Sequence, residues 1–200
     1  MQTIDEGDAL ERKRRIGIAQ ECGGILAYAE AFYVQSILYE ATASREAFQR
    51  FACAVVRDDP PAIIVSAIQE ALTHAAGLSR YFWPSTTKGV TPARAKRLRE
   101  LYKVEETSPL HDRALRNALE HFDERLDEYL LRDIAGIILT DPLVEPHTIA
   151  DEAIGHVFRA VDPWEGIFIL LSEKFEFFPV MDEVEQILTR GASDRASRVE

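Results

Sequence analysis

Apolar residues recur at helical spacing over the first two thirds of the chain, which predicts a mainly helical protein. Ser44 suits the N-cap of a helix that ends near Val56, and Pro61 suits the first turn of a third helix that runs to about Tyr81. Gly23-Gly24 predicts a break or kink in the long first element. The apolar stripe of that element comprises Ile25, Tyr28, Ala29, Phe32, Ser36, Ile37 and Tyr39.

Two further prolines mark helix starts. Thr91-Pro92 predicts a helix to about Tyr102, with Thr91 as its cap and Pro92 at its first position. Ser108-Pro109 repeats this punctuation and predicts one long helix that continues to about Arg132.

The pattern changes after Asp133. Residues 155–161 and 167–171 flank a turn, residues 175–177 alternate after another turn, and residues 137–139 are a weaker strand candidate. Apolar spacing then predicts a closing helix over residues 180–188 that stops at Gly191. The expected fold is mainly α: a helical bundle at residues 1–132, followed at residues 133–200 by a small antiparallel β-meander and a terminal helix packed on the bundle as one unit.

Composition limits the functional classes. The 200 residues fit one globular domain or a domain with an appendage. Residues 166–171 form one of the longest apolar stretches and are too few to cross a bilayer, and the first residues lack the apolar part of a signal peptide. Cys22 and Cys53 show no metal-ligand spacing and fit a reducing compartment. We therefore expect a cytoplasmic protein with no membrane partner, no metal and no cofactor.

The net charge of −11 argues against a protein that coats nucleic acid through its overall charge. One local exception spans sixteen residues with a single acid, Glu100, and could be either a solvated helix face or a surface that steers RNA. Its basic residues are Lys88, Arg94, Lys96, Arg97, Arg99 and Lys103.

The polar decapeptide RNALEHFDER, residues 116–125, lies within the last expected helix of the bundle. On a helical wheel that starts at Leu115, its apolar residues fall within about 60° of one direction, whereas Asn117 and His121 fall near 200° and 240°. Asn117 and His121 should therefore point away from the core of their own chain. Arg116 and His121 are about 140° apart, so one helix alone presents them poorly to a single phosphate.

Arg116-Asn117-x-x-x-His121 resembles the Arg-polar-x-x-x-His signature of the HEPN (higher eukaryote and prokaryote nucleotide-binding) helical superfamily. The resemblance covers roughly residues 8–132 and implies a HEPN-like helical bundle, a site shared across a homodimer, and metal-independent endoribonuclease or RNA-binding activity of a bacterial defence or toxin–antitoxin type. The C-terminal meander is not part of the usual HEPN bundle.

The resemblance implies that Arg116 and His121 are catalytic, with Asn117 and Glu120 in support. Imidazole exchanges protons near neutral pH, and a guanidinium stabilises charge on a phosphate. RNA would be steered by Arg113 and by the basic helix at Arg94, Lys96, Arg97 and Arg99.

A second hypothesis remains open: a non-enzymatic helical dimerisation or adaptor module whose polar face binds a protein partner. The acidity of the chain and the added meander favour it. The two hypotheses differ in whether Arg116 and His121 are available to a phosphate.

Overall fold

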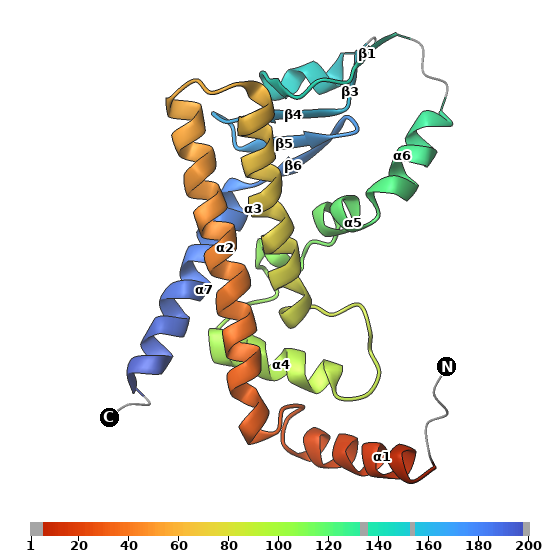
Figure 1. Cartoon of the computed structure of the whole chain (residues 1–200), viewed down its shortest axis with the longest axis vertical. Coiled ribbons are helices and arrows are strands. Elements are labelled where there is room, and N and C mark those ends of the chain that lie inside the picture. The colour runs from red at the N-terminus through yellow and green to blue at the C-terminus, as the bar shows by residue number, and fades with distance from the viewer. Residues whose placement is uncertain (1–5, 133–135, 153–154, 198–200) are drawn as a thin grey trace.

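The computed structural model describes residues 6–132, 136–152 and 155–197. Its centre is a long pair of helices, α2 (Glu30–Val56) and α3 (Pro61–Phe82), joined by a short turn at the top of Figure 1. α1 (Glu6–Glu21) projects from the foot of α2 beyond a short 3-10 turn, η1 (Ala27–Ala29). The fold is mainly α with a C-terminal β appendage, as the sequence predicts.

The expected helix end near Val56 and the expected helix start at Pro61 are confirmed, but the helix start expected at Ser44 is wrong. α2 runs through this position without interruption. The Ser44 hydroxyl is buried and donates to the Ala71 carbonyl of α3 at 2.9 Å instead of capping its own helix. The predicted break at Gly23-Gly24 is confirmed, because both glycines have positive φ after the end of α1.

α4 (Thr91–Tyr102) lies across the foot of the α2–α3 pair (Figure 1). The expected cap at Thr91 is wrong: the helix begins after Val90 and has no side-chain cap. Ser108 does act as a cap, accepting a hydrogen bond from the Leu110 N–H, but it opens only the 3-10 turn η2 (Pro109–His111).

The single helix expected over residues 109–132 is also wrong. After η2 come α5 (Ala114–Glu120) and α6 (Phe122–Leu130), separated at His121, whose φ of −114° and ψ of 40° are not helical. The break lets α6 reach the appended sheet, where the Phe122 ring meets the Phe158 ring edge-on at 5.7 Å between centroids. Tertiary packing thus ends a helix that the local pattern would continue.

The predicted meander is present as β4 (Arg159–Asp162), β5 (Ile167–Leu170) and β6 (Glu173–Glu176), all antiparallel. The sheet also contains β2 (Leu143–Val144), which pairs parallel to β4. The strand expected over residues 155–161 is split at Phe158. Its first part, β3 (Gly155–Val157), pairs parallel with β1 (Ile137–Leu139), and η3 (His147–Asp151) lies between β2 and β3.

The closing helix is confirmed as α7 (Phe178–Ser197), but Gly191 does not stop it. A Cβ added at Gly191 would lie 3.0 Å from the Leu38 side chain and 3.2 Å from the Tyr102 ring, so glycine allows α7 to pack closely on α2 and α4. Phe177, just before α7, stacks on Phe48 and meets Phe51 edge-on. The described residues of the helical part and of the β appendage with α7 therefore share one hydrophobic core.

Candidate functional site

Arg116, the first residue of the HEPN-like signature, lies inside the molecule with 5% of its surface exposed. Its Nη1 donates to the Trp83 carbonyl at 3.0 Å and lies 3.5 Å from the Ser79 hydroxyl. Burial lowers the pKa of Arg116, the Glu120 carboxylate opposes that shift, and the charges of Arg113 and Arg80 add to it. A guanidinium that is held in this way is not free to reach a phosphate.

Glu120 is the counter-ion of two arginines. Its Oε1 accepts from the Arg80 Nε at 2.8 Å and Nη2 at 2.6 Å, and lies 3.8 Å from the Arg116 Nε. This carboxylate joins α5 to α3 and neutralises charge beside the buried guanidinium. Its position is that of a structural ion pair rather than a free general base.

Asn117 and His121 are exposed, as the helical wheel predicts. The His121 side chain is 57% exposed, and its Nδ1 lies 3.5 Å from the Glu124 carboxylate. The structure therefore brings Asn117 and His121 to solvent but leaves Arg116 beneath them. Within one chain, the signature residues do not share a surface.

Four arginines gather around the C-terminal end of α3, and we call them the arginine collar. Arg94 donates to the Arg80 carbonyl at 3.5 Å, and Arg99 donates to the Phe82 carbonyl at 2.5 Å. Arg116 donates to the Trp83 carbonyl at 3.0 Å, and Arg113 donates to the Pro84 carbonyl at 3.3 Å. The last carbonyls of a helix have no acceptor role within it and mark the negative end of its dipole. The collar therefore explains much of the basic character of residues 88–116 by internal contacts.

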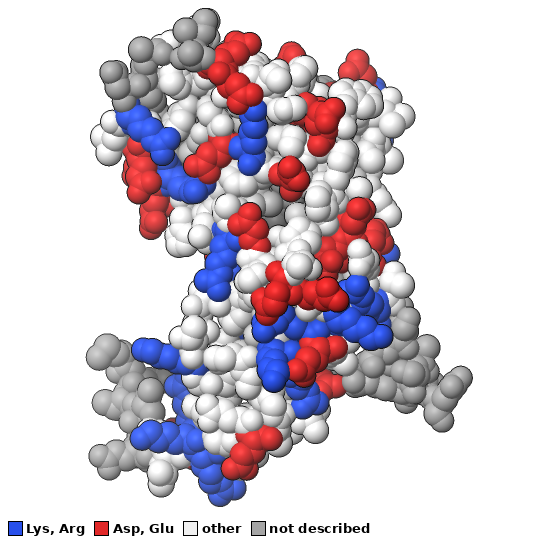
Figure 2. All heavy atoms as spheres, turned by 180° about the vertical axis from the view of Figure 1, so that it is seen from behind, with Lys and Arg blue, Asp and Glu red and all other residues white. Residues whose placement is uncertain are grey.

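Arg97 and Lys96, the other two residues expected to bind RNA, differ. Arg97 donates to the Cys22 carbonyl at 2.8 Å and pairs with the Glu30 carboxylate, which fastens α4 to the turn between α1 and α2. Lys96 is 74% exposed and has only a long 3.9 Å pair with Glu100 among the described residues. On the face shown in Figure 2, blue and red atoms are interspersed over the middle of the molecule.

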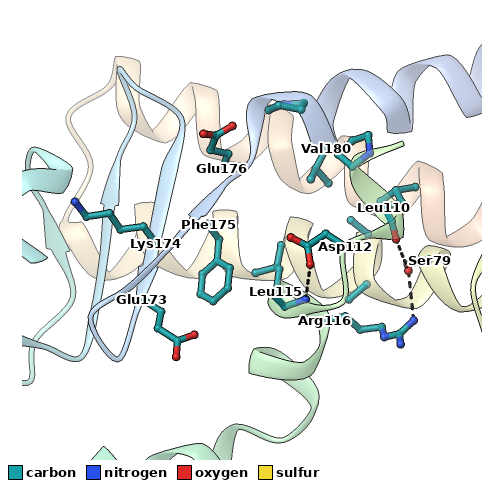
Figure 3. A pocket seen from close by; sticks show the side chains of 15 residues that line it. Ser79, Leu110, Asp112, Leu115, Arg116, Glu173, Lys174, Phe175, Glu176 and Val180 are labelled. Carbon is teal, nitrogen blue, oxygen red and sulfur yellow. Dashed lines mark hydrogen bonds between the residues drawn. The ribbon is translucent and has the colours of Figure 1, made fainter. Parts of the chain in front are cut away.

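A cavity of about 530 Å³ lies between α3, the η2–α5 segment, β6 and the start of α7. Its wall is mostly apolar, and Arg116 and Ser79 lie at one end (Figure 3). Sequence reasoning missed this cavity. The sequence feature that could have indicated the cavity is the pair Ala75-Ala76, whose small side chains lie on the α3 surface that faces β6 and α7. Its significance depends on which elements pack against that surface.

A second polar cluster surrounds the buried Asp162 at the end of β4. Its Oδ2 accepts from the His147 backbone N–H at 2.9 Å and lies 3.0 Å from the His147 Nδ1, while Oδ1 accepts from the N–H groups of Trp164 and Glu165, both at 3.1 Å. Burial alone would raise the pKa of Asp162, but these hydrogen bonds outweigh it and hold the pKa below the ordinary value. The cluster ties η3 to the β4–β5 turn.

Asp162→Asn should therefore lower the stability at neutral pH by about 2 kcal/mol, since three backbone N–H groups lose a buried, charged acceptor. Because the folded-state pKa of Asp162 is depressed, its contribution to stability is present above the ordinary pKa of 3.8 and is lost as pH falls through the lower folded-state pKa. Urea unfolding at several pH values measures this. The variant should show a shallower acid decline than wild type, whereas parallel declines would contradict the assignment; the exposed Asp123→Asn is the control.

Within the part of the chain that the structure describes, no group of three or more His, Cys, Asp or Glu side chains is arranged to hold a metal ion. Among the described helices, none has the length and apolar character needed to cross a membrane. Comparison of the chain with protein-family models, with curated proteins and with solved structures gave no match.

Proposed function

We propose that this protein is a non-enzymatic helical module that works by association, with the outer face of α2 binding a second copy of the chain. The observation that carries the proposal is the exposure of three aromatic side chains at the start of the α2 region. Tyr28 is 73% exposed, Phe32 74% and Tyr39 64%. We call them the aromatic stripe.

The aromatic stripe is not part of the monomer's core. Ile25 and Ile37, which share the sequence pattern with it, are buried, whereas the three aromatic residues face outward. Phe32 and Tyr39 are seven residues apart, which places them on one side of α2, and Tyr28 lies in η1, four residues before Phe32. Aromatic residues gathered on one exposed face are typical of an interaction site rather than of a solvated surface.

α1 is a second element whose surface is largely exposed in the single chain. Among its described side chains only Ala19 is buried, and Leu10 is 72% exposed and Ile18 39% exposed. Figure 1 shows this helix projecting from the bundle. A lone helix of 16 residues is marginal in water, so contacts outside this chain would stabilise it.

A second copy is the occupant that suits both surfaces. A two-fold dimer brings identical patches together, and an uncharged aromatic stripe is complementary to itself. At their observed exposure the three aromatic residues would supply roughly 400 Å², about half of the ~800 Å² that each partner contributes to a stable interface. α1 can supply the remainder.

A metal-independent, HEPN-like endoribonuclease is the second candidate, and the exposed imidazole of His121 beside the exposed Asn117 supports it. Against it stands Arg116, whose donors are directed at Trp83 and Ser79. Equal RNA-degradation profiles for wild type and His121→Ala at low salt would remove the catalytic version. A profile that depends on His121 would restore it.

Phe32→Lys should abolish self-association because it places a charge at the centre of the aromatic stripe. Light scattering coupled to size exclusion should give wild type twice the 22.6 kDa chain mass and the variant a single chain mass. Val56→Lys is the matched control, since Val56 is an 87% exposed apolar residue at the other end of the same helix. A wild type that stays at one chain mass at high concentration would overturn the proposal.

A further inference from the structure

The cavity between α3, β6 and α7 has the size of a small-molecule site. Its volume of about 530 Å³ falls within the range of roughly 300 to 1,000 Å³ that is common for ligand pockets. Ala75 and Ala76 leave space on the α3 side, and Leu110, Leu115, Phe175 and Val180 supply the rest of the apolar wall. An apolar group of modest size would bury its surface there.

The basic side chains that line the cavity already have hydrogen-bond or ion-pair partners in the protein. The two basic ones are directed elsewhere: the Lys174 ammonium pairs with Asp151 at 2.6 Å, and Arg116 donates to the Trp83 carbonyl. Figure 3 shows Lys174 extending away from Phe175 and Asp112. Among the residues that the structure describes, the cavity therefore offers no free cation to an anionic ligand.

The acidic side chains at the mouth are more available. Asp112 accepts the Ala114 N–H at 2.8 Å through Oδ1 and has no basic partner among the described residues, and the exposed Glu176 likewise has none. Glu173 also lines the cavity and shares its charge with Arg125. In Figure 3 the Asp112 carboxylate lies beside Leu115, whereas Glu176 and Glu173 extend from β6 on opposite sides of it.

We propose that this cavity binds a small organic amine, with its apolar body against Phe175 and Leu115 and its ammonium beside Asp112 at the mouth, where Glu176 adds negative charge. Apolar burial supplies the affinity, and the two carboxylates select positive charge. The aromatic stripe contributes nothing to this cavity, so the ligand site and the proposed dimer stand or fall separately.

The test compares three probes of the same shape by NMR titration of the full chain: 2-phenylethylamine, 2-phenylethanol and 3-phenylpropionate. The amine should bind about tenfold more tightly than the alcohol, and the carboxylate more weakly than either. Shifts should map to α3, β6 and the start of α7. Equal affinity for the three probes, or no amine binding up to about 10 mM, would overturn the proposal.

Variants separate the contribution of the carboxylates to amine binding from the contribution of the apolar wall. Glu176→Gln and Asp112→Asn should each weaken amine binding about three- to tenfold and leave alcohol binding unchanged; the asparagine can still accept the Ala114 N–H. Ala76→Leu should fill the cavity and remove binding of both probes. Should Ala76→Leu fail to fold, the two charge variants still decide, because unchanged amine binding in both contradicts the assignment.

Discussion

Gly24→Ala should cost about 3 kcal/mol or more of unfolding free energy. Gly24 has φ of +87°, and an added Cβ would lie 2.1 Å from the Arg94 nitrogen and 2.6 Å from the Ala93 carbonyl carbon. Both are backbone atoms of α4, so neither can move aside as a flexible side chain would. The substitution should separate the turn after α1 from α4 and weaken the Arg97 contacts to Cys22 and Glu30. Urea unfolding followed by circular dichroism measures the loss.

Gly89→Ala separates the cost of a positive φ from the cost of the steric clash that Gly24→Ala would make with α4. Gly89 also has positive φ, +66°, but nothing lies within 4 Å of an added Cβ. It should therefore cost only about 1 kcal/mol. Equal losses for the two variants would show that the close approach of Gly24 to α4 does not hold this part of the fold together.

Arg116→Met should cost about 2 to 3 kcal/mol, because it leaves the Trp83 carbonyl without its charged donor inside the protein. Methionine has nearly the same length, so packing changes little. Arg116→Lys should fall between methionine and wild type, because an ammonium can still donate to one carbonyl. Chemical denaturation measures the series.

Asn117→Ala on the same short helix is the control, since Asn117 is exposed and should change stability by less than about 0.5 kcal/mol. If Arg116→Met is as stable as wild type but removes an RNA-cleaving activity, Arg116 is catalytic and not structural. That outcome would favour the nuclease over the association module.

The helix starts at Pro61 and at Thr91-Pro92 were predictable from sequence, whereas the hydroxyl caps assigned to Ser44 and Thr91 were not. Pro61 fixes its own φ at a value that suits the first turn of a helix, so its signal is local. The hydroxyl of Ser44 instead found an acceptor, Ala71, that only the folded α2–α3 pair provides. The break at His121 has the same origin, because it depends on where the sheet lies relative to α6.

The candidate site shows the same division. The wheel predicted that Asn117 and His121 are exposed, because orientation relative to a helix's own apolar side is local information. The burial of Arg116 depends on the Trp83 carbonyl, 33 residues away in sequence, and the rest of the collar likewise depends on the end of α3. A basic run therefore looks the same in sequence whether its guanidinium groups contact RNA or helix carbonyls.

The aromatic stripe was hidden by an apolar pattern that covers two sides of one helix. Phe32 and Ile37 are about 140° apart on a wheel, so they cannot both face one core. In the structure Ile37 is buried and Phe32 is exposed. The expectation of a single apolar stripe is therefore wrong: its residues divide between the core and an exposed face, which we assign to association.

Amide hydrogen exchange at increasing protein concentration tests this association most directly, because it locates the interface as well as detecting it. We expect exchange to slow with concentration in α1 and in the first half of α2, and to stay constant in α7. Phe32→Lys should remove that dependence. Exchange in α1 and α2 that is independent of concentration, at concentrations where the protein remains folded, would contradict the proposal that the aromatic stripe binds a second copy.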